Sequence, residues 1–133
     1  MAKKKIAKSN WGPRGAFAKP KVLMAQQEYR EMSWAARKVL EVLEYQFNGR
    51  NNGNLAATHV MMADWGGMSK TVLAASLREL TERNLIQKTR GYDRSRDNGR
   101  PNLYALTWLP IDECPGADLE EGPTETPKRK LLL

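Results

Sequence analysis

The sequence is poor in residues that bind metals or form disulfides: its 133 residues include one cysteine, Cys114, and one histidine, His59. A single thiol excludes an intramolecular disulfide and fits a reducing compartment. Metal sites in proteins combine several His, Cys or carboxylate ligands, and His59 has no second histidine to join it. The sequence therefore predicts no metal site and no cofactor, and His59 is interpreted as a surface or capping residue.

Long apolar runs and catalytic groupings are also missing. No run approaches the roughly 18–20 apolar residues that a membrane-spanning helix requires, and no hydrophobic stretch follows the basic N-terminus as in a secretory signal. The chain has no supported Ser-His-Asp or Cys-His arrangement and no carboxylate pair in a plausible pocket. We therefore expect a cytoplasmic protein that is not an enzyme and has no membrane partner.

Positive charge dominates the chain and is unevenly distributed. The formal net charge is +7, and residues 1–21 carry seven basic side chains and no acidic one. From Asp112 onward, six acidic residues stand against three basic ones. A strongly basic chain suggests an acidic partner such as nucleic acid. The division predicts a flexible basic arm at 1–21, a folded domain at 22–110, and a disordered acidic tail, rich in Pro, Gly and Glu, at 111–133.

Two amphipathic helices are predicted by the spacing of apolar residues. The first follows Ser33, a favourable N-cap, and its apolar positions are Ala36, Val39, Leu40, Leu43 and Phe47. The second follows the N-cap Ser69, and one of its faces carries Leu73, Ser76, Leu77 and Leu80. Asn84 is a plausible residue to end this second helix, because Asn tolerates left-handed backbone angles.

The remaining elements are shorter. They are a helix or turn at 22–31, a very short strand at 55–57, a brief helix at 59–65 capped by Thr58, and two alternating strands at 85–92 and 102–109. A polar, basic loop joins the two strands into a hairpin. Trp34, Trp65 and Trp108 fall within predicted elements and are expected in the core, which leaves Trp11 free to stack on a base.

The order of these elements, from residue 33 to about 110, resembles a winged helix–turn–helix domain. Residues 58–65 correspond to the first helix of the motif, "GGM" to its turn, and "SKTVLAASLRELTERNLI" to the recognition helix and wing entry. The segment "GRPNLYALTWLPID" is similar to the wing exit of small helix–turn–helix proteins encoded by bacteriophages, plasmids and other mobile elements. The resemblance implies an α+β fold, a three-helix core with a two-stranded β-hairpin wing. Two consecutive glycines in the turn and two alanines on the outward helix face depart from the usual pattern.

The resemblance implies that helix 69–83 enters the major groove and that the wing, 93–101, contacts the backbone or the minor groove. The candidate DNA-binding residues of the helix are Ser69, Lys70, Thr71, Ala74, Ala75 and Arg78. Those of the wing are Lys88, Arg90, Arg94, Arg96 and Arg100, and those of the arm are Lys3, Lys4 and Lys5. The alternative interpretation is an ordinary exposed helix face beside a solvated charged loop.

Three functions are compatible with this sequence. The first is a sequence-specific double-stranded DNA-binding protein that regulates transcription as a repressor, by occupying an operator. Such a protein is expected to be associated with the nucleoid of a bacterial or phage-infected cell. The second is a replication accessory or initiator protein of a phage or plasmid that binds origin repeats. The third is a protein-docking winged helix that acts on host machinery, with the acidic tail as its partner contact. Helix–turn–helix proteins usually bind as dimers, and apolar surface around residues 22–34 is the predicted homodimer contact.

Overall fold

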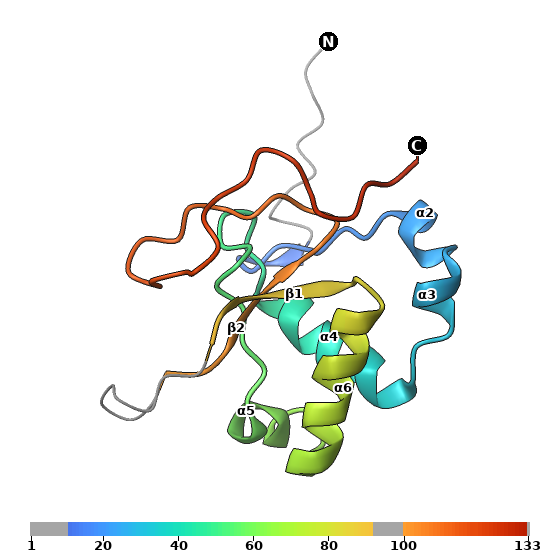
Figure 1. Ribbon diagram of the computed structural model, residues 1–133. Coiled ribbons are helices and arrows are strands. Elements are labelled where there is room, and N and C mark those ends of the chain that lie inside the picture. Colours follow the sequence, from blue (N-terminus) through green and yellow to red (C-terminus); the bar gives the residue numbers. More distant parts are fainter. Residues whose placement is uncertain (1–10, 92–99, 133) are drawn as a thin grey trace.

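The computed structural model describes residues 11–91 and 100–132, which form five helices and a two-stranded antiparallel sheet (Figure 1). In chain order the elements are α2 (Lys21–Met24), α3 (Gln27–Arg30), α4 (Trp34–Gln46), α5 (His59–Ala63), α6 (Lys70–Glu82), β1 (Ile86–Arg90) and β2 (Leu103–Leu106). The predicted α+β class is confirmed, and the arrangement is compatible with a winged helix. None of the described helices has the length and apolar composition needed to cross a membrane.

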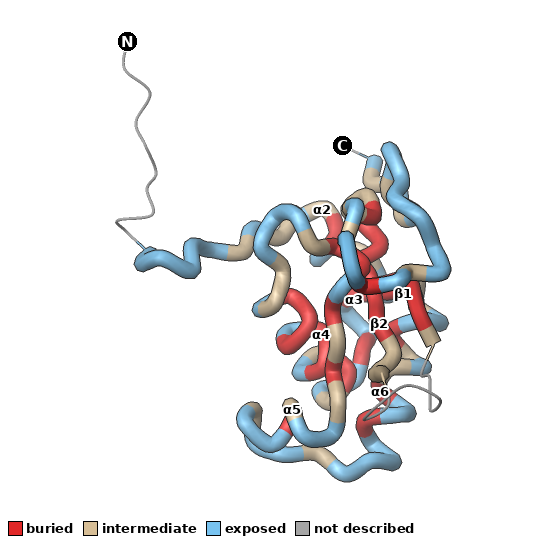
Figure 2. The backbone as a smooth tube through the Cα atoms, turned by 90° about the vertical axis from the view of Figure 1, so that its left-hand side faces the viewer, coloured by how far each residue is buried: buried red, intermediate tan, exposed pale blue. Residues whose placement is uncertain are grey.

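Helix α4 begins behind Ser33, whose hydroxyl oxygen accepts a hydrogen bond from the Ala36 backbone N–H at 3.1 Å. This N-cap satisfies one of the backbone donors that a helix leaves unpaired at its start. The predicted apolar stripe is buried at Ala36, Val39, Leu40 and Leu43, and Figure 2 shows this helix largely buried in the middle of the molecule. Phe47 lies just beyond the helix as its C-cap and is partly buried. The predicted helix and its buried face are confirmed.

Helix α6 packs against α4 through Leu73, Ser76 and Leu80 (Figure 1). A polar contact at the edge of this interface joins the two helices. The carboxylate of Glu79 accepts hydrogen bonds from the Ser33 backbone N–H at 2.8 Å and from the Ser33 hydroxyl at 2.7 Å. Burial raises the pKa of Glu79, but these bonds and the contact with the neighbouring guanidinium one turn on outweigh it and hold the pKa below its ordinary value.

The sheet is a hairpin with one extra bridge. Strands β1 and β2 pair antiparallel with Lys88 opposite Tyr104, and the register shifts between Lys88 and Arg90. Leu55, in the predicted short strand, forms a bridge on the other side of β2, where the Tyr104 N–H donates to its carbonyl oxygen at 2.8 Å. Strand β2 is therefore held on both sides.

The loop after α4 is anchored by Asn52, which is completely buried. Its Nδ2 donates to the carbonyl oxygens of Leu106, Leu109 and Pro110 at 2.8–3.2 Å. Its Oδ1 accepts from the Leu106 N–H at 2.7 Å, and its own backbone N–H donates to Asp112 Oδ2 at 2.8 Å. Both polar atoms of this buried side chain are therefore satisfied, and the exit of β2 is tied to the loop.

The tail is expected to be disordered, but residues 111–132 lie against the folded domain in the structure. Residues 111–132 run without regular structure against the sheet side of the domain (Figure 1). Ile111 and Ala117 are buried, and the Glu120 N–H donates to the Thr89 carbonyl oxygen at 2.7 Å. Over its described residues the tail has no helix or strand of its own, and backbone groups of the domain supply hydrogen-bond partners for its backbone. The tail therefore belongs to the folded unit.

Arg129 fastens the end of the tail to the C-terminus of α6. Its Nε donates to the Asn84 carbonyl oxygen at 2.8 Å, and its Nη2 donates to the Arg83 carbonyl oxygen at 2.6 Å. Its Nη1 donates to Gln26 Oε1 and lies 3.3 Å from Glu28 Oε1. Asn84 ends the helix with a φ of 56°, as predicted. A cation here satisfies carbonyl groups that the helix end leaves free.

Residues 11–20 of the predicted flexible arm also lie against the domain. Phe17 packs on the hydrophobic core. Lys19 Nζ donates to the Tyr29 hydroxyl at 2.6 Å and lies 2.8 Å from Glu44 Oε2 in α4. Burial raises the pKa of Glu44, and the hydrogen bond from Lys19 offsets only part of that increase. An ion pair at the edge of the core therefore holds this part of the arm.

The predictions for the tryptophans have different outcomes. Trp108 is buried, as predicted. Trp65 is partly buried and packs edge-on against the ring of Tyr45, with 5.3 Å between the centroids. The prediction for Trp34 is wrong, because its side chain is 85% exposed. With about 100° of rotation per residue, Trp34 lies almost opposite the buried Ala36 two residues later.

The predicted homodimer contact at residues 22–34 is largely used within the domain. Leu23, Tyr29 and Met32 are buried in the hydrophobic core. Trp34 is the large apolar side chain of this segment that stays most exposed.

Candidate nucleic-acid interface

Two consecutive glycines shape the turn between α5 and α6. Gly66 and Gly67 have φ values of +97° and +80°, a backbone region in which a residue with a Cβ is strained. The Gly67 N–H donates to the Met62 carbonyl oxygen at 2.9 Å and closes the end of α5. At the start of α5, the predicted cap Thr58 accepts from the Met61 N–H. The glycine pair therefore builds the reversal from which α6 begins.

The N-terminal end of α6 is capped and carries no negative charge. Ser69 Oγ accepts from the Val72 N–H at 3.1 Å, which confirms the predicted cap. No acidic residue stands in the first turn, and Lys70 and Thr71 are exposed there. A helix N-terminus presents backbone N–H groups and a partial positive charge, which together favour an anion such as phosphate.

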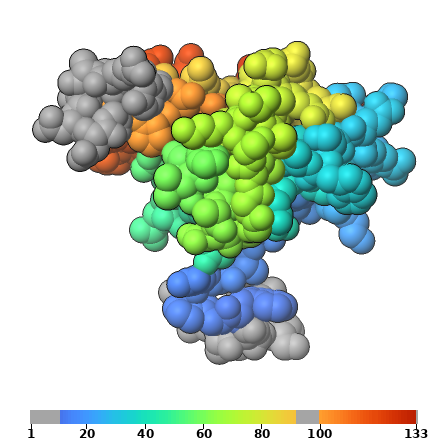
Figure 3. Space-filling model, turned by 90° about the horizontal axis from the view of Figure 1, so that it is seen from below, coloured from blue at the N-terminus to red at the C-terminus, as the bar shows by residue number. Residues whose placement is uncertain are grey.

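The predicted outward face of α6 is exposed along its length. Its residues are Lys70, Thr71, Ala74, Ala75 and Arg78. The molecule seen from below, in Figure 3, has α5 and α6 at the centre of its surface. Small side chains in the middle of such a face allow a helix to approach base edges closely, and Ala can contact the methyl group of thymine.

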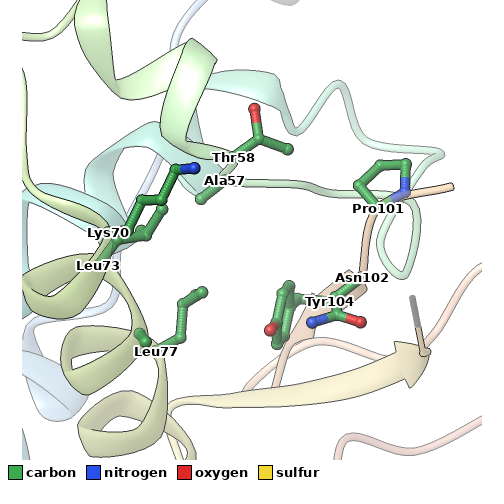
Figure 4. Close-up of a pocket in the computed structure, with 9 residues that line it drawn as sticks. Ala57, Thr58, Lys70, Leu73, Leu77, Pro101, Asn102 and Tyr104 are labelled. Atoms are coloured by element: carbon green, nitrogen blue, oxygen red, sulfur yellow. The ribbon is translucent and has the colours of Figure 1, made fainter. Parts of the chain in front are cut away.

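A groove separates α6 from the hairpin. It consists of two adjoining cavities of about 290 and 350 Å³, which share the lining residues Ala74, Leu77, Asn102 and Tyr104. Figure 4 shows the first cavity, where side chains of α6 face the start of β2. Lys70 lines one cavity, and Arg78 and Lys88 line the other. The groove therefore combines an apolar floor with cations toward both ends.

Tyr104 and Asn102 line this groove but are not among the residues that the sequence predicts as DNA contacts. The pKa of the Tyr104 phenol is raised by burial, and a hydrogen bond with Asn102 offsets part of the increase. The phenol therefore stays protonated near neutral pH. Strand alternation predicts which residues of β2 share a face, but the α6 side of the hairpin follows only from the tertiary packing.

The structure separates the predicted wing cations from one another. Lys88 is exposed on β1 beside the groove. Arg90 is buried, and its guanidinium donates to the carbonyl oxygens of Ala117 at 2.7 Å and Pro101 at 2.8 Å. The register shift after Lys88 interrupts the strand alternation and turns Arg90 under the tail. The prediction of Arg90 as an accessible DNA contact is therefore wrong.

Arg100 is engaged by the acidic tail. Its Nη1 lies 2.7 Å from Asp118 Oδ2, and its side chain is 22% exposed. On the other strand of the hairpin, the Gly91 N–H donates to Glu120 Oε2 at 3.0 Å. The tail therefore places carboxylates beside both strands of the hairpin, and any anion that binds Arg100 has to displace Asp118.

Five predicted contacts lie outside the described residues, namely Lys3, Lys4, Lys5, Arg94 and Arg96. Within residues 11–91 and 100–132, no group of three or more His, Cys, Asp or Glu side chains is arranged to hold a metal ion. No protein-family model, curated protein or solved structure matches this chain.

Proposed function

We propose that this protein is a winged helix–turn–helix protein that binds double-stranded DNA sequence-specifically and represses transcription. The observation that carries the proposal is the exposed, capped and cationic face of α6, which borders a groove whose far wall is the hairpin. Such an arrangement offers one element to a DNA groove and a second to the adjoining backbone.

The dimensions of α6 suit the major groove. A helix with its side chains is about 10–12 Å wide, and the major groove of B-DNA is about 12 Å wide. With α6 inserted by its N-terminal end, Lys70 and Thr71 meet base edges or phosphates. Arg78, two turns further along the helix, and Lys88 on β1 then reach flanking phosphates. The hairpin is the part of the chain that continues toward the backbone or the minor groove.

The proposed mode of action requires no cofactor. A bound protein that covers a promoter excludes the transcription machinery by occupancy. The protein would act in the cytoplasm, where bacterial DNA lies. The position of the bound sites distinguishes this role from replication: operators lie near promoters, whereas initiator proteins bind repeats at an origin.

The first test is selection of fragments of the source genome by the full chain, followed by fluorescence anisotropy on the enriched site. Lys70→Ala and Thr71→Ala are expected to weaken specific binding by about 1–3 kcal/mol each, roughly 5- to 150-fold, if each contacts a base edge. The far-ultraviolet circular dichroism is expected to stay the same, because both side chains are exposed. Arg50→Ala, in the exposed loop after α4, is the matched control.

Two results would contradict the proposal. One is a wild-type chain that binds no DNA at low salt, where phosphate contacts are strongest. The other is binding that is equally strong in both α6 variants and in the Arg50→Ala control, which would move the recognition surface away from α6.

A further inference from the structure

Helix α4 presents a line of four exposed side chains on the side opposite its buried face. These are Trp34, which is 85% exposed, Lys38, Glu41 and Tyr45, which is 56% exposed. Their spacing of four, three and four residues keeps all four within about 60° of one another around the helix. Although the Tyr45 ring also contacts Trp65 edge-on, two large aromatic side chains that stay this exposed on one helix face mark a candidate contact surface.

The order of side chains in this α4 stripe is self-complementary. Trp34 and Tyr45 are equally distant from the midpoint of the stripe, about 8 Å along the axis, and Lys38 and Glu41 are each about 2 Å from it. A second copy of the helix running antiparallel therefore places Trp34 against Tyr45 and Lys38 against Glu41. Both aromatic pairs and both charge pairs form at once, as an interface with a twofold axis requires.

We propose that the α4 stripe is the contact of a homodimer in which two α4 helices pack antiparallel. The occupant is a second copy of this chain because the opposite charges at the centre pair only in this orientation. A shallow cavity of about 460 Å³ lies along the first half of the stripe, lined by Trp34, Ala35, Arg37, Lys38 and Glu41. It offers room for the aromatic side chain of the partner.

The neighbours of the stripe indicate how strong the dimer is. The Arg37 guanidinium lies 5.8 Å from the ring centroid of Trp34, and Arg14 donates to the Tyr45 hydroxyl at 2.5 Å. The antiparallel pairing brings these two cations together at each end, which opposes association. A helix of 13 residues is about 20 Å long and covers less area than the roughly 800 Å² per partner of a standard interface. The dimer is therefore a weak one.

The stripe lies outside the groove between α6 and the hairpin and borders the turn before α6 from the other side, where the Tyr45 ring packs on Trp65 and Lys38 Nζ lies close to Gly66. In Figure 3, the side chains of α4 lie beside those of α6 on the lower surface, and none of the four stripe residues lines the groove next to the hairpin. Association of the free chain can therefore be measured without DNA, and its outcome is independent of the proposed function.

The test is sedimentation of charge-reversed variants, alone and mixed. The wild-type chain is expected to shift from monomer toward dimer over about 10–500 µM, the range of a weak interface. Lys38→Glu leaves two acidic residues in the stripe, and Glu41→Lys leaves two basic ones, so each variant repels its own copies. We expect each to associate at least about tenfold more weakly than the wild type.

Mixing the two variants supplies the decisive measurement. The acidic stripe of one then faces the basic stripe of the other, and the mixture is expected to form a heterodimer at least as readily as the wild type forms its homodimer. Recovery on mixing cannot come from a change within one helix. Trp34→Ala is expected to weaken association, whereas Arg50→Glu, a charge reversal outside the stripe, is expected to leave it unchanged.

A wild-type chain that remains monomeric over the whole range would overturn the proposal. A dimer that persists in Lys38→Glu, in Glu41→Lys and in Trp34→Ala would overturn it too, because another surface would then hold the two copies. So would a mixture of the two charge variants that stays monomeric while the wild type dimerises. Circular dichroism and thermal unfolding of each variant exclude misfolding as the cause of a loss.

Discussion

Replacing Arg129 by Ala tests whether the tail is part of the folded unit. The Arg129 side chain is only 10% exposed and donates to the carbonyl oxygens of Arg83 and Asn84 and to Gln26 Oε1. Arg129→Ala removes all of these donors and leaves the carbonyl groups at the end of α6 without this partner.

The size of the effect follows from these contacts. A hydrogen bond with a charged partner contributes about 1.5–3 kcal/mol, and a cation at a helix C-terminus contributes up to about 2 kcal/mol when partly buried. The contributions overlap, because one guanidinium makes them all and water replaces some of them in the variant. We expect Arg129→Ala to lower the free energy of unfolding by about 3 kcal/mol. For a chain of this size, that corresponds to a fall in Tm of roughly 9–15 °C.

Thermal unfolding followed by circular dichroism measures this change. Lys130→Ala is the matched control, because Lys130 is the next residue, has the same charge and is exposed. The control is expected to unfold within about 2 °C of the wild type, as most exposed substitutions do. If Arg129→Ala unfolds as late as Lys130→Ala, the tail does not stabilise the domain, and its packing against α6 has no energetic consequence.

Two further predictions concern single carboxylates. Asp118→Asn removes the charge that pairs with Arg100 at 2.7 Å and keeps a residue that tolerates the φ of 54°. The slope of log K for DNA against log salt is then expected to steepen by about 0.9 if Arg100 contacts a phosphate, and an unchanged slope would remove Arg100 from the interface. Glu79 has a pKa below its ordinary value of 4.5 in the folded state, so its stabilising effect is present above that value and is lost as the pH falls through the lowered pKa. Urea unfolding is therefore expected to separate wild type from Glu79→Gln at pH 7 and to bring the two together in acid, where an unchanged difference would contradict the role of Ser33.

The parts of the fold that depend on neighbours in sequence could be predicted. Ser33, Ser69 and Thr58 cap their helices as expected, because capping involves a side chain and a backbone group two or three residues away. The buried stripe of α4 follows equally from local spacing. For Trp34, apolar character alone predicts a core position, whereas its angle on the helix points the side chain away from the core.

Features that depend on distant parts of the chain could not be predicted. The β-bulge that buries Arg90 requires knowledge of the register between β1 and β2, since simple alternation places Arg90 on the same face as Lys88. The tail is poor in apolar residues and has no period, so its composition indicates disorder. Its attachment comes from backbone groups of β1 and from Arg129, and no local pattern predicts such partners.

The path of the tail also determines how it can affect DNA binding. In Figure 1, residues 111–132 lie in the upper part of the molecule, whereas α5 and the N-terminal end of α6 lie at the bottom. The carboxylates of the tail therefore oppose DNA mainly at the hairpin, where Asp118 pairs with Arg100, since charges separated by more than about 8 Å are screened at physiological salt. Deleting the tail would remove this pair together with the contacts of Arg129, so that charge and stability would change at once. Asp118→Asn removes the charge and keeps a residue type that tolerates the φ of 54° at this position. A gain in DNA affinity there, beside a loss of stability in Arg129→Ala, would assign the two roles of the tail to different residues.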